Sequence, residues 1–140
     1  MKCLFVQAPF ARWIVSRVAG RDIGVKFLEY RTRPTKIRGR IGIVQSKSGT
    51  VIGDVEITGC QYSMDLKRYI WLLVFPRQYE KPVSFTPKRG AVVWIEIDYD
   101  PEKQKIAPAL TEKEALRELG KYGKAIDKFF RNGIKNEVNR

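Results

Sequence analysis

The stretch Gly24-Val25-Lys26-Phe27-Leu28-Glu29-Tyr30-Arg31 places a glycine and three charged residues at the spacing G-x-K-x-x-E-x-R. Residues 26–31 are predicted to form a short strand. Side chains three positions apart on a strand point to opposite faces, so Lys26 and Glu29 meet only if a bulge or a turn brings them together. Three interpretations stay open for this pair: an ion pair that ties the chain to its domain, a pair that contacts a base or phosphate in a pocket, and a catalytic pair. In the last of these, burial lowers the pKa of Lys26 so that it acts as a base.

The same stretch lies within the most basic part of the chain. The net charge is +12, from 27 basic and 15 acidic residues, and residues 11–40 hold nine basic side chains against only Asp22 and Glu29. Because the planar guanidinium of arginine binds phosphate oxygens in pairs, this segment is predicted to bind nucleic acid. The alternatives are a solvated surface that keeps the protein soluble and a surface for a protein partner. The sequence contains no basic amphipathic helix with a long apolar face, which is the feature that would favour a membrane partner.

Several classes of function are excluded by composition. The chain has no histidine, which excludes Ser-His-Asp and Cys-His triads and histidine-ligated metals. Its two cysteines, Cys3 and Cys60, are too few for a disulfide framework or a four-ligand zinc site, and no metal or cofactor is expected. No signal peptide and no apolar run of about 18 residues is found, so a cytoplasmic protein is expected.

Local patterns predict an α+β domain. Strands are expected over 2–7, 26–31, 38–45, 51–58, 69–75 and 91–99, with Pro76 ending the fifth. Helical spacing predicts a helix over 9–19, and the capping-box pair Thr111 and Glu114 begins a second helix that Gly133 ends. Leu116, Leu119 and Tyr122 are expected on its apolar face. We therefore expect a small β-barrel or strongly curled sheet of five to six strands, with an N-terminal and a C-terminal helix. Residues 1–100 are predicted to form the domain, and residues 101–140 a helical extension packed on it.

Further motifs flank the central stretch in a fixed order. Gln7-Ala8-Pro9-Phe10-Ala11 lies at the first strand-to-helix junction, and Arg38-Gly39-Arg40 leads into the third strand. Gly53-Asp54-Val55-Glu56-Ile57 and Tyr69-x-Trp71 follow. Taken together, with Ala8 counted as an insertion, these motifs resemble the ASCH family of the PUA-like superfamily over residues 1–98.

The resemblance implies a PUA-like β-barrel, similar to small RNA-binding barrels. Some ASCH proteins are amidohydrolases that act on acylated cytidine through a lysine, a threonine nucleophile and a glutamate, and others have been linked to RNA cleavage. Two positions depart from that pattern. Phe27 stands where the family has Thr or Asp, and Glu29 stands where the nucleophile would be. A carboxylate cannot simply replace a lysine-activated hydroxyl, so binding is ranked above hydrolysis.

The first functional prediction is therefore an ASCH/PUA-like domain that binds RNA or a modified nucleotide in a basic cleft around residues 24–40. Side chains predicted to contact nucleic acid are Arg12, Lys26, Tyr30, Arg31, Arg33, Lys36, Arg38 and Arg40. The cleft is predicted to include Gln7, Pro9, Phe10 and Trp13, with Phe10, Trp13 and Tyr30 as candidates for base stacking. The second prediction is a small hydrolase of N-acylated nucleosides or RNA, with Lys26 and Glu29 as catalytic residues. The third is a subunit or scaffold of a larger complex that binds a protein through residues 112–140.

Overall fold

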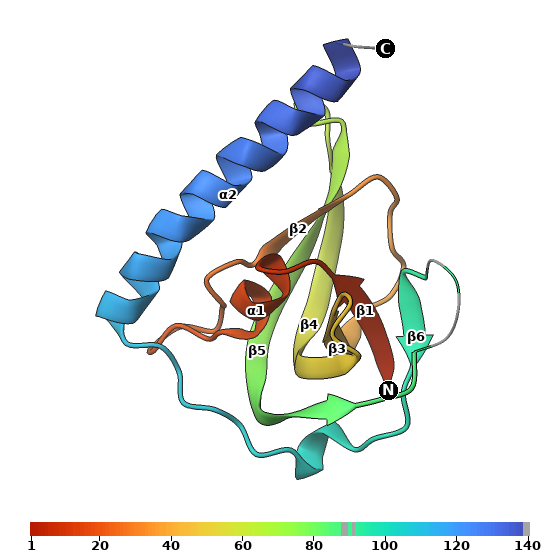
Figure 1. Ribbon diagram of the computed structural model, residues 1–140, viewed down its shortest axis with the longest axis vertical. Coiled ribbons are helices and arrows are strands. Elements are labelled where there is room, and N and C mark those ends of the chain that lie inside the picture. The colour runs from red at the N-terminus through yellow and green to blue at the C-terminus, as the bar shows by residue number, and fades with distance from the viewer. Residues whose placement is uncertain (88–89, 91, 139–140) are drawn as a thin grey trace.

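A computed structural model describes the backbone of residues 1–87, 90 and 92–138, with side chains of the last helix up to Ala125. Six strands form one mixed sheet, accompanied by two α-helices and one short 3-10 helix (Figure 1). The elements in chain order are β1 (Lys2–Val6), α1 (Phe10–Val15), β2 (Leu28–Arg31), β3 (Gly39–Gln45), β4 (Thr50–Ser63), β5 (Arg68–Ser84), β6 (Trp94–Glu96), η1 (Pro101–Lys103) and α2 (Glu112–Val138).

The sheet has the strand order β2-β5-β4-β3-β1-β6. Only β1 and β3 pair in parallel, with Cys3 opposite Gly42, and every other pair is antiparallel. Both ends of this order are edge strands, so the sheet is not closed and the expected barrel is not confirmed. The expected α+β class is confirmed. The two halves of the sheet nevertheless approach one another: Trp71 on β5, the strand next to the β2 edge, stacks on Trp94 on the β6 edge with ring centroids 5.9 Å apart.

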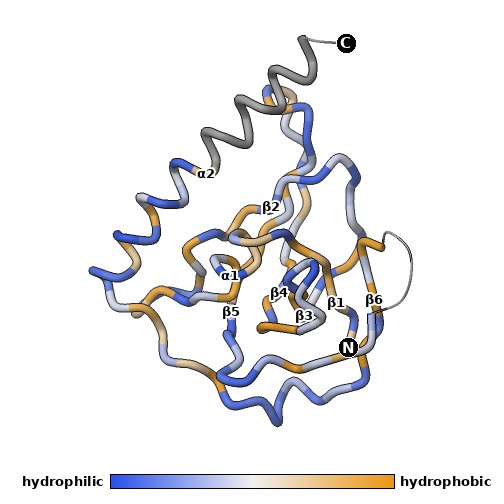
Figure 2. The backbone as a smooth tube through the Cα atoms, viewed as in Figure 1, coloured by the Kyte–Doolittle hydropathy of each residue, from blue (hydrophilic) through white to orange (hydrophobic). Residues whose placement is uncertain are grey.

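The main core lies between α1 and the concave side of this curled sheet. α1 buries Ala11, Trp13, Ile14 and Val15 against alternating apolar side chains of the strands, among them Leu4, Ile41, Ile43, Val55, Ile57, Trp71 and Leu73. A helix of six residues is unstable alone, so this burial is what holds it. A second cluster around Cys3, Val44, Val51 and Tyr79 fills the other side of the sheet. In Figure 2, hydrophobic and hydrophilic positions vary along the strands, and hydrophilic positions are frequent in the loops at the lower edge.

The first helix is shorter than predicted. It ends at Val15. Ser16 has an extended backbone, and its side-chain Oγ donates to the carbonyl of Arg12 at 2.7 Å. Arg17 and Val18 then form isolated bridges with Gly24 and Leu110. These long-range pairings take up backbone groups that further helical turns would have used, and helical spacing alone could not reveal them.

The strands around β5 also differ from prediction. β5 runs through Pro76, because Val55 alone faces Phe75 and Pro76 in a β-bulge that needs no N–H from the proline. Leu72 and Phe75 are exposed, so β5 is not buried on both faces. β6 ends at Glu96, although Ile97 and Tyr99 still point into the second cluster. Ala91, the predicted start of that strand, lies outside the described residues.

The C-terminal helix begins as predicted. Thr111 and Glu114 exchange hydrogen bonds of 3.2 and 3.3 Å in a capping box. The helix does not end at Gly133 but continues to Val138. Its buried face was predicted only in part: Tyr122 packs on Trp13 as expected, but Ala115 and Glu118 are buried, while Leu116 and Leu119 are exposed. No described helix is long and apolar enough to span a membrane.

Candidate nucleic-acid pocket

Gly24, the first residue of the G-x-K-x-x-E-x-R stretch, lies against the end of α1. A Cβ at this position would be 2.5 Å from the carbonyl oxygen of Ile14 and 2.7 Å from that of Trp13. The close approach lets the N–H of Lys26 donate to the carbonyl of Trp13 at 3.1 Å. That carbonyl is among the last of α1 and has no partner within the helix. The glycine therefore fixes where Lys26 enters the domain.

Lys26 and Glu29 meet because Lys26 precedes the strand. β2 begins at Leu28, so the alternation of strand side chains does not apply between residues 26 and 29. Both side chains are almost fully buried, and Lys26 Nζ lies 3.6 Å from Glu29 Oε1. Lys26 also donates to the carbonyl of Leu28. Burial lowers the pKa of Lys26, and the neighbouring Glu29 charge opposes that shift.

Glu29 keeps one carboxylate oxygen without a hydrogen bond. Its Oε2 lies 3.6 Å from the guanidinium of Arg31, which is an ion-pair distance. This oxygen is buried, and no hydrogen-bond partner exists for it among the described residues. Buried polar atoms without a partner cost about 1–3 kcal/mol each, and such an atom beside a cavity is ready to accept a donor.

Arg31 joins the two ends of the curled sheet. From β2 its guanidinium donates to the carbonyl of Phe5 on β1 at 2.8 Å and lies 5.6 Å from the ring centroid of Trp71. β1 and β2 are not paired by backbone hydrogen bonds. The side chain of Arg31 therefore bridges strands that the sheet leaves apart.

A pocket of about 350 Å³ opens between β1, α1 and β2. Of the predicted site residues it brings together Gln7, Phe10, Lys26, Glu29, Tyr30 and Arg31. Lys26 Nζ lies 5.1 Å from the ring centroid of Tyr30 and 6.0 Å from that of Phe10, so two aromatic rings flank the buried ammonium. Burial, and then the charge of Glu29, raises the pKa of Tyr30. The pocket thus combines aromatic faces, two cations and one acceptor that has no hydrogen bond among the described residues.

The other predicted residues lie outside the pocket lining. Trp13 is buried beneath Phe10, and Pro9 is exposed at the start of α1. Arg12 donates to Glu118 of α2 at 2.9 Å. Arg33, Lys36 and Arg38 are exposed in the loop that follows β2. Their contact with nucleic acid stays a prediction.

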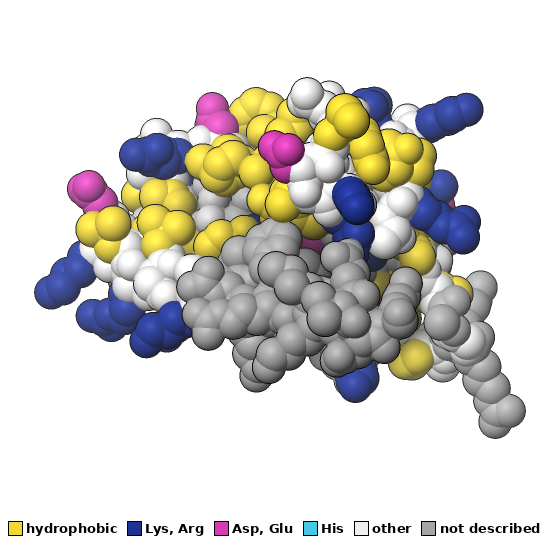
Figure 3. Space-filling view, turned by 90° about the horizontal axis from the view of Figure 1, so that it is seen from above, with side chains coloured by type: hydrophobic (Ala, Val, Ile, Leu, Met, Phe, Trp, Pro, Cys, Tyr) yellow, Lys and Arg dark blue, Asp and Glu magenta, His cyan; other side chains and the backbone are white. Residues whose placement is uncertain are grey.

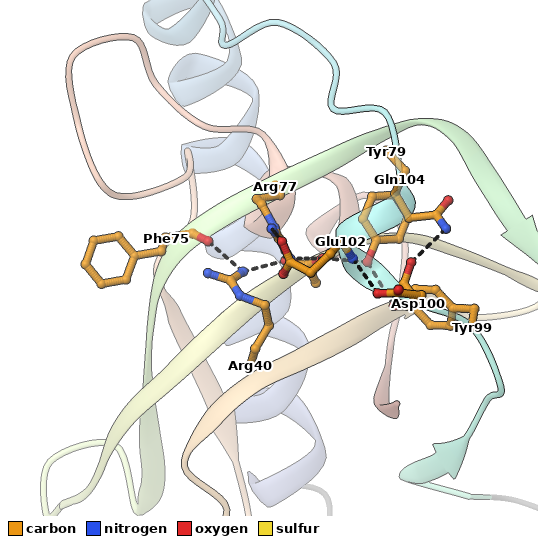
Figure 4. Close-up of polar contacts among 9 residues, drawn as sticks. Arg40, Phe75, Arg77, Tyr79, Tyr99, Asp100, Glu102 and Gln104 are labelled. Carbon is orange, nitrogen blue, oxygen red and sulfur yellow. Dashed lines mark hydrogen bonds and ion pairs between the residues drawn. The ribbon is translucent and has the colours of Figure 1, made fainter.

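Arg40 belongs to a separate buried network, shown in Figure 4. It pairs with Asp54, which is fully buried, and donates to the carbonyl of Phe75 at 3.0 Å. Arg77 binds the two oxygens of Asp54 at 2.8 and 3.1 Å, and Tyr79 donates to the same carboxylate. Every lone-pair direction of Asp54 is thus used within the protein.

Several pocket residues were not predicted from the sequence. Phe5, Val6, Ser46, Val92 and Val93 also line the pocket. They come from three separate segments, which the β1–β3 and β1–β6 pairings bring together. No local pattern in the sequence signals those pairings. Within the described residues, no three Cys, Asp or Glu side chains gather closely enough to bind a metal ion.

The comparisons with known proteins agree with the motifs. The sequence model of the ASCH domain matches residues 4–110, which is most of the chain. The chain belongs to the ASCH domain family. This family is PUA-like and has been suggested to bind RNA. The search of curated proteins gave no match. The ASCH match reaches beyond residue 98, where the quoted motifs end, and stops just before α2.

Proposed function

We propose that the pocket between β1, α1 and β2 binds one unstacked base of a single-stranded RNA. The observation that carries this proposal is the buried Oε2 of Glu29, a residue that lines the pocket: this oxygen has no hydrogen-bond donor among the described residues. An N–H group on a base edge supplies such a donor. Beside it, Lys26 supplies a positive charge for an acceptor atom on the same ligand.

The size and lining of the pocket support the same ligand. A volume of about 350 Å³ is near the lower end of ligand pockets, so the pocket suits a single nucleotide and not a duplex. The rings of Phe10 and Tyr30 offer faces on which a base can stack, which contributes about 1–3 kcal/mol per base in single-strand-binding proteins. The exposed Arg33, Lys36 and Arg38 follow Arg31 in the chain and are proposed to contact phosphates of the same strand.

The test is binding of a fluorescently labelled single-stranded RNA to wild type and to Glu29→Gln. Hydrogen bonds to charged groups contribute about 1.5–3 kcal/mol, so we expect Glu29→Gln to bind about 10–150-fold more weakly. Glu80→Gln is the matched control, because it changes the net charge by the same amount at an exposed carboxylate on β5. Equal affinity of the two variants would contradict the proposed role of Glu29. Far-ultraviolet circular dichroism checks that both variants fold.

A second candidate function is hydrolysis of an N-acylated nucleoside or of RNA in the same pocket. The observation that favours it is the lowered pKa of the buried Lys26 beside the Glu29 carboxylate. A neutral lysine could take a proton from water as the oxygen attacks the acyl carbon, and the C–N bond would then break with return of the proton to nitrogen. Wild type and Lys26→Ala are compared on acylated nucleosides and single-stranded RNA. Absent turnover, or equal turnover by both proteins, rejects this candidate.

A further inference from the structure

Helix α2 carries a line of basic residues that the ASCH match does not include. Lys113, Arg117, Lys121 and Lys124 are all exposed and recur at intervals of four, four and three residues. At about 100° per residue they fall within an arc of about 80° on the helix. The same spacing continues in the sequence at Lys128, Arg131 and Lys135. We call the four described residues the α2 basic stripe.

No acidic residue of the described helix lies within this arc. Glu112 and Glu114 are in the first turn, where they favour the positive end of the helix dipole. Glu118 lies outside the arc, and its Oε2 accepts hydrogen bonds from α1. Lys121 is the one member of the stripe with a described ion pair, 3.4 Å from Glu118 Oε1. The stripe is therefore a largely uncompensated positive surface.

Glu118 fixes the rotation of α2 on the domain. Its Oε2 accepts hydrogen bonds from Trp13 Nε1 at 2.6 Å and from Arg12 at 2.9 Å. Because Lys121 also pairs with Glu118, this member of the stripe lies near Arg12. Leu116 and Leu119 lie outside the arc of the stripe and line a second, apolar pocket with Phe27.

Ring contacts connect helix α2 to the pocket. Tyr122 of α2 packs edge-on against Trp13 with centroids 5.2 Å apart, and Trp13 packs in the same way against Phe10 at 5.9 Å. Phe10 lines the pocket. Burial raises the pKa of Tyr122 to about 12, and the charges of Tyr30 and Glu29 add to the shift.

We propose that the α2 basic stripe binds the phosphates of the RNA strand whose base occupies the pocket. The inference rests on the proposed function and names a second contact surface for the same ligand. Its support is charge complementarity: one cation per helical turn, about 5.4 Å apart along the axis, offers a row of contacts to successive phosphates of an extended polyanion. Lys121 of the stripe and Arg12 of α1, the helix that supplies Phe10 to the pocket, both pair with Glu118.

The test uses the full chain with the substitutions Lys113→Gln, Arg117→Gln, Lys121→Gln and Lys124→Gln together. The control replaces four exposed lysines elsewhere with glutamine, at Lys47, Lys67, Lys81 and Lys103. Both variants lose four positive charges, so a general effect of net charge is the same in both. The RNA probe is a single strand of about 20 nucleotides, longer than the footprint of one small binding domain.

For each phosphate contact with a single strand, the slope of log K against log salt changes by about 0.7. Four contacts therefore predict a slope shallower by about 2.8 in the stripe variant. Between about 50 mM and about 200 mM salt, wild-type affinity should fall about 50-fold more than that of the variant. A slope equal to that of the control variant overturns the proposal.

Two further measurements separate the stripe from the pocket. If Glu29→Gln leaves RNA binding unchanged while the stripe variant loses it, the pocket proposal fails and the stripe stands. If Glu29→Gln weakens binding and the stripe variant does not, the stripe proposal fails alone. Vesicles of neutral lipid with about one-third phosphatidylserine probe the apolar side of α2; stripe-dependent vesicle binding with stripe-independent RNA binding also overturns the proposal.

Discussion

Asp54→Asn tests how the buried ion network stabilises the fold. The substitution keeps the shape of the side chain but removes the negative charge between Arg40 and Arg77. Removing one partner from a buried pair costs about 3–5 kcal/mol. The two guanidiniums are each 24% exposed, so water offsets part of the loss, and Arg40 keeps its bond to the carbonyl of Phe75. We therefore expect the lower end of that range, about 3 kcal/mol.

The assay is equilibrium unfolding in urea, with the slope m compared between variants. With m of about 2 kcal/mol per molar, the midpoint should fall by about 1.5 M. Glu102→Gln is the control, because Glu102 binds the same Arg77 at 3.2 Å but is 72% exposed. Exposed pairs contribute about 0–1 kcal/mol, so its midpoint should change little. A loss for Asp54→Asn no greater than for Glu102→Gln would refute the reasoning that burial makes this network important.

Three further outcomes are expected. The hydrogen bond from Trp13, with nearby Arg12 and Lys121, lowers the pKa of Glu118 from its ordinary 4.5. Ionised Glu118 therefore stabilises the folded state above pH 4.5, and this contribution is lost as the pH falls through the folded-state pKa. Glu118→Gln should flatten this dependence of the unfolding free energy on acid pH, as measured by urea titrations. Gly24→Ala should destabilise by about 1–3 kcal/mol through overpacking, whereas Gly120→Ala, with open space around it in α2, should stabilise by up to about 1 kcal/mol; thermal melts that give both the same sign would contradict this. Burial raises the pKa of Cys3 to about 11, so iodoacetamide at about pH 8 should label it far more slowly in native protein than in urea, as mass spectrometry of the labelled peptides would report.

Features set by neighbouring residues were predictable from the sequence. The capping box of Thr111 and Glu114 needs only three residues of spacing, and the alternation of Val55 and Ile57 needs only the pleat of a strand. Both were predicted correctly. The early end of α1 was not, because Ser16 leaves the helix to permit pairings with distant residues such as Leu110. The buried face of α2 was predicted only in part for the same reason: Tyr122 packs on Trp13 as expected, but hydrophobicity also favoured Leu116, whereas a charged residue, Glu118, finds partners on α1.

The candidate site divides in the same way. Lys26, Glu29, Tyr30 and Arg31 are close in sequence, and the motif already indicated that they act together. Val92 and Val93 join them only because β6 pairs with β1. Arg40 matches the basic pattern as well as Arg31 does, yet it turns to Asp54, whose burial no local pattern indicated. Charge density along the chain therefore identified the region of the site but not which cations are already paired within the protein.

The spacing G-x-K-x-x-E-x-R can now be explained residue by residue. Gly24 allows the backbone to touch the end of α1, which places Lys26 at the base of the pocket. Arg31 uses its guanidinium on the carbonyl of Phe5, across a gap that no backbone pairing spans. Lys26 is bonded to the carbonyl of Leu28. Two of the three charged residues thus hold the protein together, and the carboxylate between them keeps Oε2 without a donor. An ion pair whose only role was to tie the chain would be expected to satisfy that oxygen, since leaving it bare costs stability. The motif therefore favours the proposed pocket around Glu29. In that pocket Lys26 and Arg31 offset the cost of burying the carboxylate, and the proposed ligand supplies the hydrogen-bond donor that Oε2 lacks.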